Sequence, residues 1–480
     1  MTLTYGGIII VLVLGKDYFM YEIDFNHPIW VHFIGIGGIS MSGLAEVLLG
    51  KGFRVTGSDI VASDLTKRLT DRGAEIFIGH RSENLSPDVD LVVFTAAVHP
   101  DNPEYIAAES YGIPLLNRAD MLGELMRNYP SSVAVAGTHG KTTTTSMVSE
   151  IMLAADLDPT VSVGGMLDSI GGNIRVGASP YFVCEACEFT NSYLSLSPLV
   201  SIILNVANDH LDFFGNLENI RKSFRQFAEK LTPEGTLIIC SNIDNFEFFT
   251  EGLPCHVLTV GRREEDDYRF SDEVYDAIGH PTLTLHEKST GADVKLELNV
   301  PGEHNIWNAI CAIAAGRTLG ISMDSAIYAL EHFDSPHRRF ELVGYLGTIP
   351  VIDDYGHHPD EVAACIKCAR NTSAKRIVAV FQAHTYSRVK LLLDDFTKAL
   401  SLADIAVIGE IYSDREKDNL GMSAAVMAEE LRKVGTDAYS FPSFGEIEQF
   451  LLETLKDGDI LLTIGSKEVW MIGYDLLGLR

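Results

Sequence analysis

Short apolar runs recur along the chain, and most of them end at a glycine, a hydroxyl residue or a charged residue. Examples are Trp30–Gly38, Ser132–Gly140 and Arg376–His384. A segment with helical apolar spacing follows each run, and after the first one Leu44 and Leu48 fall on one face. Strands that alternate with helices predict parallel sheets, whose ligands bind beyond the carboxyl ends of the strands. We therefore expect functional side chains at the polar positions that close these runs.

The runs fall into three successive segments, and the chain shows no short internal repeat. Residues 20–127 contain a first glycine-rich turn. Residues 128–334 contain a second one, followed by a more β-like stretch at Gly235–Pro301, and residues 335–480 form the last segment. A length of 480 residues fits three domains of about 150 residues each. Residues 1–19 hold an apolar core without a basic leader or a small-residue cleavage site, so we interpret them as a disordered or artefactual extension.

Composition narrows the setting in which the protein acts. With 46% hydrophobic and 21% charged residues the chain reads as globular, and its net charge of −29 argues against a nucleic-acid partner. The longest apolar run, Ile8–Leu14, is shorter than the ~18 residues of a membrane span, so we expect no membrane partner. Seven cysteines favour a reducing cytoplasm over a disulfide framework. Cys365 and Cys368 have CxxC spacing, but they lie in a helical stretch, so we disfavour a zinc site.

The first glycine-rich turn follows the predicted strand Trp30–Ile34 and includes Gly35, Ile36, Gly37 and Gly38. Glycines permit a tight turn, and the N-terminus of the next helix offers free N–H groups to an anion. Asp59 closes the following run, where a carboxylate can bind a ribose. This pattern predicts a nucleotide-diphosphate site. Ser40 stands where the third glycine of the dinucleotide fingerprint belongs, so a packing turn without a ligand stays an alternative.

The second turn has the pattern of a phosphate loop. The predicted strand Val133–Ala136 leads into Gly137, Thr138, His139, Gly140, Lys141, Thr142 and Thr143, and a helix follows. In such loops backbone N–H groups wrap phosphate oxygens, the lysine reaches the β and γ phosphates, and the hydroxyl can bind Mg²⁺. We therefore predict that this segment binds ATP.

Two polar positions at strand ends are candidates for the metal shell. Glu185 closes the run Tyr181–Glu185, and His210 lies just past the run Ser201–Val206. Mg²⁺ prefers oxygen ligands, which suits Glu185; His210 could instead orient a phosphate or a water, or be structural. Glu188 is an alternative ligand to Glu185.

Two nucleotide sites on one chain indicate a ligase that activates an acid carried on a nucleotide. A dehydrogenase would need only the first turn and a simple ATPase only the second. An NAD-dependent oxidoreductase and a catalytically inactive nucleotide-binding regulator remain as less favoured alternatives, because Lys141 and Glu185 are both present.

The motifs also resemble a known family, the Mur ligases, which are relatives of folylpolyglutamate synthetase. Gly137–Thr143 resembles the family's phosphate loop, and Phe33–Glu46 is similar to the first motif of its alanine-adding branch. Later motifs of that branch are matched in order by His304–Ala309, His337–Phe340, Asp353–Pro359 and Tyr386–Arg388. The resemblance covers residues 20–480.

This resemblance implies a three-domain α/β enzyme with a Rossmann-like N-terminal domain, a central P-loop ATPase-like domain and a Rossmann-like C-terminal domain. It implies ATP and Mg²⁺ as cofactors, and UDP-N-acetylmuramate and L-alanine as substrates in a cytoplasmic monomer or weak homodimer. The reaction would pass through an acyl phosphate, and domain closure would exclude water. A recycling ligase that adds a preformed tripeptide to the same sugar nucleotide is the near alternative.

The resemblance also assigns roles to residues. For UDP-sugar binding it implies Gly35, Ile36, Gly37, Gly38, Ser42 and Asp59, with Arg388 as a carboxylate or phosphate clamp. For catalysis it implies Lys141, Glu185 and His210, and for the metal Thr142, Glu185 and His210. For ATP it implies Gly137, Thr138, His139, Gly140, Lys141, Thr142, Thr143, Asn305, Asn308, Arg339, Asp354, Tyr355 and His357.

Without the resemblance, some of these residues have plainer interpretations. Asn305 suits a helix N-cap and Arg339 a surface salt bridge, whereas Pro359 suits the first position of a helix. Two positions depart from the family's pattern. Thr385 stands where many relatives carry an arginine, and Gly465–Glu468 stands where Gly-Ala-Gly-Asp is expected.

Overall fold

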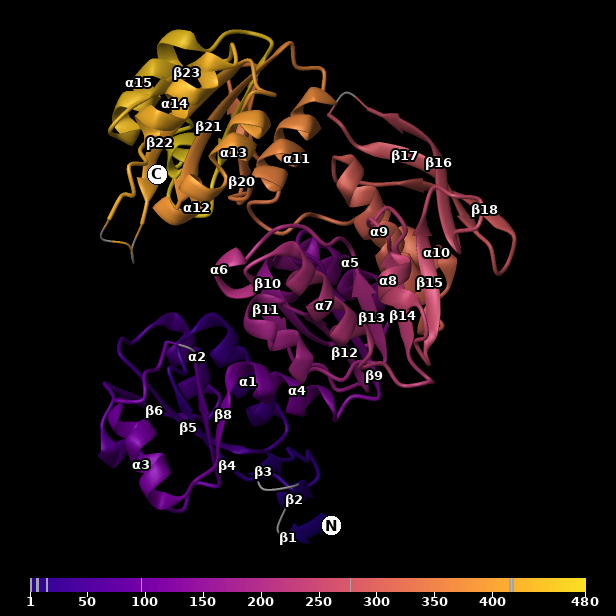
Figure 1. Ribbon diagram of the computed structural model, residues 1–480, viewed down its shortest axis with the longest axis vertical. Helices are drawn as coiled ribbons and strands as arrows, with labels where there is room; N and C mark the ends of the chain where they lie inside the picture. Colours follow the sequence, from indigo (N-terminus) through magenta and orange to yellow (C-terminus); the bar gives the residue numbers. More distant parts are fainter. Residues whose placement is uncertain are drawn as a thin grey trace. The chain divides into compact units, whose positions relative to one another are not determined.

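The computed structural model describes residues 2–5, 8–13, 16–95, 97–276, 278–413, 416 and 418–480 (Figure 1). Its backbone divides into two compact units. Unit 1 comprises Met1–Thr259 and Cys311–Ala326, and unit 2 comprises Val260–Ile310 and Ile327–Arg480. No helix within the described ranges is long and apolar enough to cross a membrane.

The chain begins with three strands: β1 (Thr2–Tyr5), β2 (Ile8–Val13) and β3 (Lys16–Tyr21). They form a three-stranded antiparallel sheet in the order β1-β2-β3. The described part of residues 1–19, which we predicted to be a disordered or artefactual extension, has a β-sheet backbone. Residues 1, 6, 7, 14 and 15 lie outside the described residues.

The first glycine-rich turn belongs to a five-stranded parallel sheet in unit 1, with the order β6-β5-β4-β7-β8. In chain order this is the 3-2-1-4-5 arrangement of a Rossmann-like sheet, whose ligand crevice lies at the carboxyl end of its first strand. The elements are β4 (Trp30–Ile34), α1 (Ile39–Gly50), β5 (Arg54–Asp59), α2 (Asp64–Asp71), β6 (Glu75–Ile78), η1 (Ser82–Asn84), β7 (Leu91–Phe94), α3 (Pro103–Tyr111), β8 (Leu115–Asn117) and α4 (Arg118–Met126).

The second turn belongs to a larger mixed sheet, whose unit 1 strands have the order β11-β10-β12-β9-β13-β14-β15. The phosphate-loop strand β9 pairs in parallel with β12 on one side and β13 on the other, so their carboxyl ends share one edge. The elements are β9 (Ser131–Ala136), α5 (Lys141–Ala154), β10 (Thr160–Leu167), η2 (Asp168–Ile170), β11 (Gly172–Arg175), β12 (Tyr181–Glu185), η3 (Phe189–Ser195), β13 (Val200–Ile203), α6 (Leu211–Phe214), α7 (Leu217–Ala228), β14 (Thr236–Cys240), α8 (Glu247–Thr250) and β15 (His256–Gly261).

The β-like stretch predicted at Gly235–Pro301 is confirmed, because it holds β14 to β18. In unit 2, β16 (Tyr268–Tyr275), β17 (Pro281–Glu287) and β18 (Ala292–Glu297) pair antiparallel. Two helices, α9 (Glu303–Thr318) and α10 (Met323–Glu331), then run from one unit's residues into the other's.

The last segment is a six-stranded sheet in the order β19-β20-β24-β21-β22-β23, parallel except for β19. Apolar clusters cover both faces; Ala379 and Phe381 face one, and Val378 and Val380 face the other, as strand alternation requires. The elements are β19 (Glu341–Leu346), β20 (Ile349–Asp354), α11 (Pro359–Arg370), β21 (Arg376–His384), α12 (Tyr386–Leu391), α13 (Leu393–Leu400), β22 (Ile405–Tyr412), α14 (Ala424–Lys433), β23 (Asp437–Ser440), α15 (Phe444–Thr454), β24 (Asp459–Ile464) and α16 (Trp470–Leu476).

Helix α11 shows how local signals set the ends of elements. Pro359 is its first residue, as predicted, and the His358 side chain accepts a hydrogen bond from the Asp360 N–H at its start. Cys365 and Cys368 are both buried along this helix, as small apolar residues would be. Among the described residues, the clusters of side chains that could hold a metal contain no cysteine.

Candidate functional site

The phosphate loop connects β9 to α5 and is held from the neighbouring strand β13. Gly140 adopts a left-handed conformation with φ of 86° immediately before Lys141 opens the helix. Asn205, which follows β13, accepts a hydrogen bond from the His139 N–H at 2.8 Å and donates one to the His139 carbonyl at 3.0 Å. The Thr138 hydroxyl accepts from the Ala207 N–H at 2.9 Å. The loop is therefore fixed in shape by the chain itself.

Lys141 lies inside this loop. Its Nζ donates to the carbonyls of Gly137 at 2.6 Å and Thr138 at 3.0 Å, and it lies 3.0 Å from a carboxylate oxygen of Glu188. Burial lowers the pKa of Lys141, but the charge and hydrogen bond of Glu188, together with the nearby Cys187 and Glu185, outweigh burial and raise the pKa overall. The ammonium group is thus held charged at the position where a phosphate loop receives the β and γ phosphates.

The structure separates the two glutamates that the sequence offered, Glu185 as the first choice and Glu188 as its alternative. Glu188, at the turn after β12, is 2% exposed and contacts Lys141. Glu185, at the end of β12, accepts a hydrogen bond from the Gly164 N–H at 2.5 Å. The geometry therefore favours Glu188 over Glu185 as the carboxylate of the phosphate loop.

Glu188, Asp209 and His210 form a cluster that could hold a cation. One ligand atom of each lies within 4.8 Å of the others. His210 has a positive φ of 50°, its ring packs against Phe189 in a tilted arrangement with a centroid distance of 4.7 Å, and its Nε2 lies 3.7 Å from Asp209. The structure therefore brings His210, predicted from the sequence, to Glu188, the alternative ligand, and to Asp209, which the sequence had not assigned to the site.

Thr142 and Thr143 are the second and third residues of α5, and both are buried. Their place in the first turn of this helix, directly after Lys141, keeps them at the loop. Asn205 is a residue that the sequence reasoning missed. Its signal was a lone amide immediately after an apolar run, which is where parallel strands present functional side chains.

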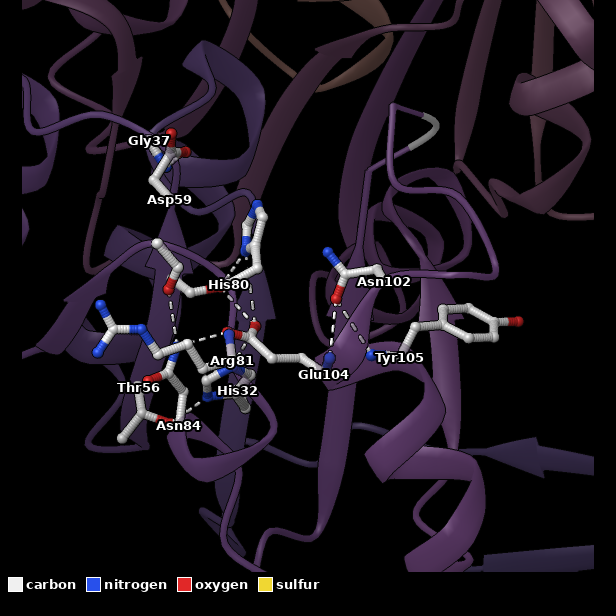
Figure 2. A network of polar contacts seen from close by, with 12 residues as sticks. His32, Gly37, Thr56, Asp59, His80, Arg81, Asn84, Asn102, Glu104 and Tyr105 are labelled. Carbon is white, nitrogen blue, oxygen red and sulfur yellow. Dashed lines mark hydrogen bonds and ion pairs between the residues drawn. The ribbon is translucent and has the colours of Figure 1, made fainter.

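The first glycine-rich turn lies at the carboxyl end of β4 and is held by β5. The N–H groups of Gly35 and Ile36 donate to the Ser58 carbonyl at 2.8 and 2.9 Å. Asp59 accepts from the Gly37 N–H at 2.8 Å, a contact visible in Figure 2. An added Cβ on Gly37 would lie 2.8 Å from the Asp59 carboxylate, so this position has no room for a side chain.

The remaining residues of this candidate site have different surroundings. Gly38 is the N-cap residue of α1. Ser42 is buried in the helix, and its hydroxyl donates to the Ile39 carbonyl at 2.9 Å. The N–H groups of Gly35, Ile36 and Gly37 are thus bonded within the chain, and the Ser42 hydroxyl is engaged inside α1.

In unit 2, Arg339 lies just before β19, and Asp354, Tyr355 and His357 lie at and after the end of β20. Burial raises the pKa of Asp354 to about 6, although Arg339 and the N–H groups of Gly356 and Phe340 act in the opposite direction. The guanidinium of Arg339 lies 5.5 Å from the ring centre of Tyr355. These contacts join two of the family's motifs within unit 2, His337–Phe340 and Asp353–Pro359.

His357 continues this cluster, since its N–H donates to Glu361 at 2.9 Å. Gly465–Glu468, the segment that differs from the family's pattern, follows β24 and lies beside this cluster. The Gly465 N–H donates to the Asp354 carbonyl at 2.9 Å. Arg338 donates to the Gly465 carbonyl at 2.6 Å and to Asp353 at 2.7 Å. Gly465, the first residue of the segment that differs from the family's pattern, therefore contacts the cluster around Asp354 directly.

Asn305 and Asn308 lie one helical turn apart in α9, and both are buried. The Asn305 amide donates to the Pro301 carbonyl at 2.7 Å, and the Asn308 amide donates to the Asn305 oxygen at 3.1 Å. Because α9 begins at Glu303, Asn305 is not its N-cap, and that plainer interpretation is wrong.

Arg388 lies in α12, which follows β21. Thr385, the departure next to it, is the N-cap residue of that helix with a positive φ of 71°. Glu416 accepts hydrogen bonds from the N–H groups of Tyr386 at 2.5 Å and Ser387 at 3.3 Å, so its carboxylate caps the helix that carries Arg388. No local sequence pattern predicts this cap, because Glu416 lies about 30 residues further along the chain.

A Rossmann-like nucleotide turn, a phosphate loop and a second Rossmann-like sheet define a class of three-domain nucleotide-dependent ligases. Three family profiles match the chain in order: "Mur ligase family, catalytic domain" at residues 30–130, "Mur ligase middle domain" at 135–316 and "Mur ligase, glutamate ligase domain" at 338–467. The chain belongs to the Mur ligase family, as the sequence predicted, and the three-domain α/β architecture is confirmed.

The relatives at 44–50% identity share one name. The UDP-N-acetylmuramate–L-alanine ligase of Lachnospira eligens is 50% identical over 459 residues, covering 95% of this chain and 100% of the relative. That of Acetivibrio thermocellus is 46% identical, covering 92% and 94%. The crystal structure of UDP-N-acetylmuramate-alanine ligase MurC from Thermotoga maritima is 30% identical with a TM-score of 0.74, covering 94% and 99%. A murein peptide ligase from Psychrobacter arcticus, at 24% identity and a TM-score of 0.65 over 94% and 98%, shares the fold.

Proposed function

We propose that this chain joins L-alanine to the lactyl carboxylate of UDP-N-acetylmuramate and converts ATP to ADP and phosphate. One observation carries the proposal: unit 1 contains both a phosphate loop with an enclosed lysine and a Rossmann-like nucleotide turn. A ligase needs both sites, whereas an oxidoreductase needs only the nucleotide turn. Relatives at up to 50% identity bear the name of this ligase. Their name favours L-alanine over a tripeptide as the amine that is joined to the sugar nucleotide.

The chemistry follows from the poor reactivity of a carboxylate. The lactyl carboxylate attacks the γ-phosphorus of ATP, ADP leaves, and an acyl phosphate forms. The unprotonated amine of alanine then attacks the acyl carbon and phosphate departs. The first step brings anions together, so Lys141, positioned by Gly137 and Thr138, neutralises charge as it develops.

The cluster after β12 and β13 fits Mg²⁺. Two carboxylates and one imidazole, from Glu188, Asp209 and His210, have ligand atoms within 4.8 Å of one another, and hard cations prefer oxygen donors. We propose that these residues hold the metal together with the Thr142 hydroxyl at the start of α5. When bound, Mg²⁺ would neutralise phosphate charge during transfer.

The other assignments stay proposals that rest on the family resemblance. We propose that Gly35–Gly38 and Asp59 bind the UDP group and that Arg388 binds the substrate's acid. For ATP we propose contacts from Asn305, Asn308, Arg339, Asp354, Tyr355 and His357. A reaction driven by ATP also fits the cytoplasm as the site of action.

The experiment that tests the function is phosphate release measured with UDP-N-acetylmuramate and ATP, with and without L-alanine. We expect release to depend on all three substrates and a product heavier than the sugar nucleotide by one alanyl residue. The tripeptide L-alanyl-D-glutamyl-diaminopimelate serves as the competing acceptor. Faster turnover with the tripeptide would assign the chain to the recycling ligases, and NADH-linked absorbance changes without ATP use would overturn the proposal.

A further inference from the structure

A buried carboxylate lies beneath the first glycine-rich turn and is not explained by the reaction. Glu104, in α3, is 0% exposed. One of its oxygens accepts from the Arg81 N–H at 3.1 Å and the Asn84 amide at 2.6 Å. The other accepts from the Ser58 hydroxyl at 2.5 Å and lies 3.3 Å from Nε2 of His32 (Figure 2).

The charge on this group is clear from its partners. Burial raises the pKa of Glu104, but the hydrogen bonds from His32, Ser58 and Asn84 outweigh burial, so the pKa is lowered overall. An ionised carboxylate only accepts hydrogen bonds. Every group that contacts Glu104 must therefore point a proton toward it.

This requirement fixes the direction of the bond to His80. The Ser58 hydroxyl has one proton and gives it to Glu104, so its oxygen can only accept from Nδ1 of His80, 2.8 Å away. His80 is then protonated on Nδ1, so Nε2 of the neutral ring carries a lone pair. Among the described residues, no partner is found for that Nε2, and the side chain is 16% exposed.

His80 lies where a bound nucleotide would extend. In a Rossmann-like site the diphosphate lies at the first turn and the acid that ends the second strand faces the ribose. Asp59 ends β5, and Ile78, its register partner, ends β6 two residues before His80. The Gly79 N–H donates to the Asp59 carbonyl at 2.8 Å. The base, beyond the ribose, comes next to the end of β6.

We propose that His80 is a specificity-determining residue whose Nε2 accepts a hydrogen bond from the imide N–H of uracil, and that Glu104 acts through Ser58 as a positioning residue that fixes this tautomer. The inference rests on the proposed UDP site. Uracil has a donor at N3 whereas cytosine has an acceptor there, so the lone pair on His80 favours uridine nucleotides over cytidine nucleotides.

The tautomer is tested directly by ¹⁵N NMR of the histidine rings in the full-length protein, with His80→Gln used to assign the signals. In the wild type we expect the Nδ1–H form of His80. In Glu104→Gln, the amide oxygen must face Arg81 and Asn84, so the amide N–H₂ donates to Ser58, whose hydroxyl then donates to His80 Nδ1. We expect this variant to show the Nε2–H form. A wild-type Nε2–H form, or an unchanged form in the variant, would overturn the proposal.

Specificity is tested by calorimetric titration with UDP and with CDP. We expect Glu104→Gln and Ser58→Ala to reduce the preference for UDP over CDP by about tenfold, the size of one exchanged hydrogen bond. Turnover at saturating substrates should stay near the wild-type value, so the effect appears in KM for the sugar nucleotide. His80→Ala should lose the preference, whereas His80→Gln, whose side-chain oxygen can accept, should keep part of it.

Thr56→Val is the matched control. The Thr56 hydroxyl lies 2.8 Å from Nδ1 of His32 and accepts from the Trp30 ring N–H at 3.0 Å, so it belongs to the same network on the side away from His80. We expect Thr56→Val to lower the melting temperature. The tautomer of His80 and the preference for UDP over CDP should both stay unchanged. If Thr56→Val and Glu104→Gln alter the preference equally, Glu104 is only structural. A wild-type protein that binds neither nucleotide would refute the UDP site itself.

Discussion

Lys141 and Glu188 show how a single contact combines stability with function. Glu188 is 2% exposed and its carboxylate lies 3.0 Å from the lysine Nζ. Removing one partner of such a pair leaves a buried charge without compensation, which costs more than the pair contributes. The two residues are therefore coupled in any variant.

Substitution of the lysine is the first prediction. We expect Lys141→Ala to lower kcat for phosphate release by at least about 10²-fold, because the phosphate charge loses its fixed cation. UDP binding by calorimetry should remain within about twofold of the wild type, since the glycine turn at Gly35–Gly38 is built on another sheet. Turnover close to the wild-type rate would contradict the role given to Lys141.

The two glutamates provide a matched pair of variants. We expect Glu188→Gln to raise the Mg²⁺ concentration needed for half-maximal activity by at least about tenfold, because a carboxylate in the cluster is lost. Glu185→Gln keeps an oxygen that can accept from Gly164, so its requirement for Mg²⁺ should change little. Activity measured against Mg²⁺ concentration checks both variants. The reverse ranking would restore Glu185 as the metal ligand.

The sequence reasoning preferred Glu185 and kept Glu188 as an alternative, and the reason it could not exclude Glu188 is local. They are three residues apart at the end of a strand, and the turn that follows determines which one faces the loop. Thr190 and Asn191 have left-handed φ values of 53° and 59° within that turn. Neither residue type demands such a conformation, so the sequence carried no reliable sign of it.

Asp354 gives a pH-dependent prediction. Its pKa of about 6 in the folded protein lies above the ordinary value of 3.8, so the folded state holds the proton more tightly than the unfolded chain. The contribution of Asp354 to the free energy of unfolding therefore falls as pH rises from about 4 to about 6 and is constant above that. Relative to Asp354→Asn, the wild type should lose stability across this window in denaturant titrations. A difference that does not change with pH would contradict the raised pKa.

At the scale of elements, the predicted boundaries succeeded where a residue type has a fixed backbone preference. Trp30–Ile34 is a strand as predicted, and Pro359 begins a helix because its ring sets φ and it lacks an N–H. Asn305 was misjudged as an N-cap because α9 begins two residues earlier, at Glu303. Capping by Glu416 depends on a distant loop, and no local pattern encodes it.

The first glycine turn yields a prediction at this scale. We expect Gly37→Ala to weaken UDP binding by about tenfold or more, because its Cβ would lie 2.8 Å from Asp59 and 3.0 Å from Thr66 and push the carboxylate aside. Gly445→Ala in α15 is the control, since no atom lies within 4 Å of its Cβ. We expect that variant to be more stable by about 0.5–1 kcal/mol and equally active. Calorimetry and thermal unfolding distinguish the two, and unchanged UDP affinity in Gly37→Ala would remove the turn from the nucleotide site.

At the scale of the whole molecule, the sequence predicted three α/β segments, and the motifs placed a nucleotide turn and a phosphate loop in the first two. Contacts within the chain divide it into two units, with both turns in unit 1 and the Asp354 cluster in unit 2. The parallel sheet type follows from the alternation of strands and helices, whereas the strand order does not. The convergence of Glu188, Asp209 and His210 depends on which strands become neighbours, and this is settled only when β12 and β13 flank β9.

The net charge gives the last prediction. A chain with a charge of −29 repels a nucleotide diphosphate at long range, although the glycine turn attracts it within a few ångströms. Salt screens the long-range repulsion first, because the Debye length falls from ~30 Å at 0.01 M to ~8 Å at 0.15 M. We therefore expect the association rate of UDP to rise by roughly threefold to tenfold over this range in stopped-flow measurements at constant Mg²⁺. Uridine, which is uncharged, is the control and should associate at a rate independent of salt. A rate for UDP that falls with salt would mean that local positive groups at the turn outweigh the net charge of the molecule.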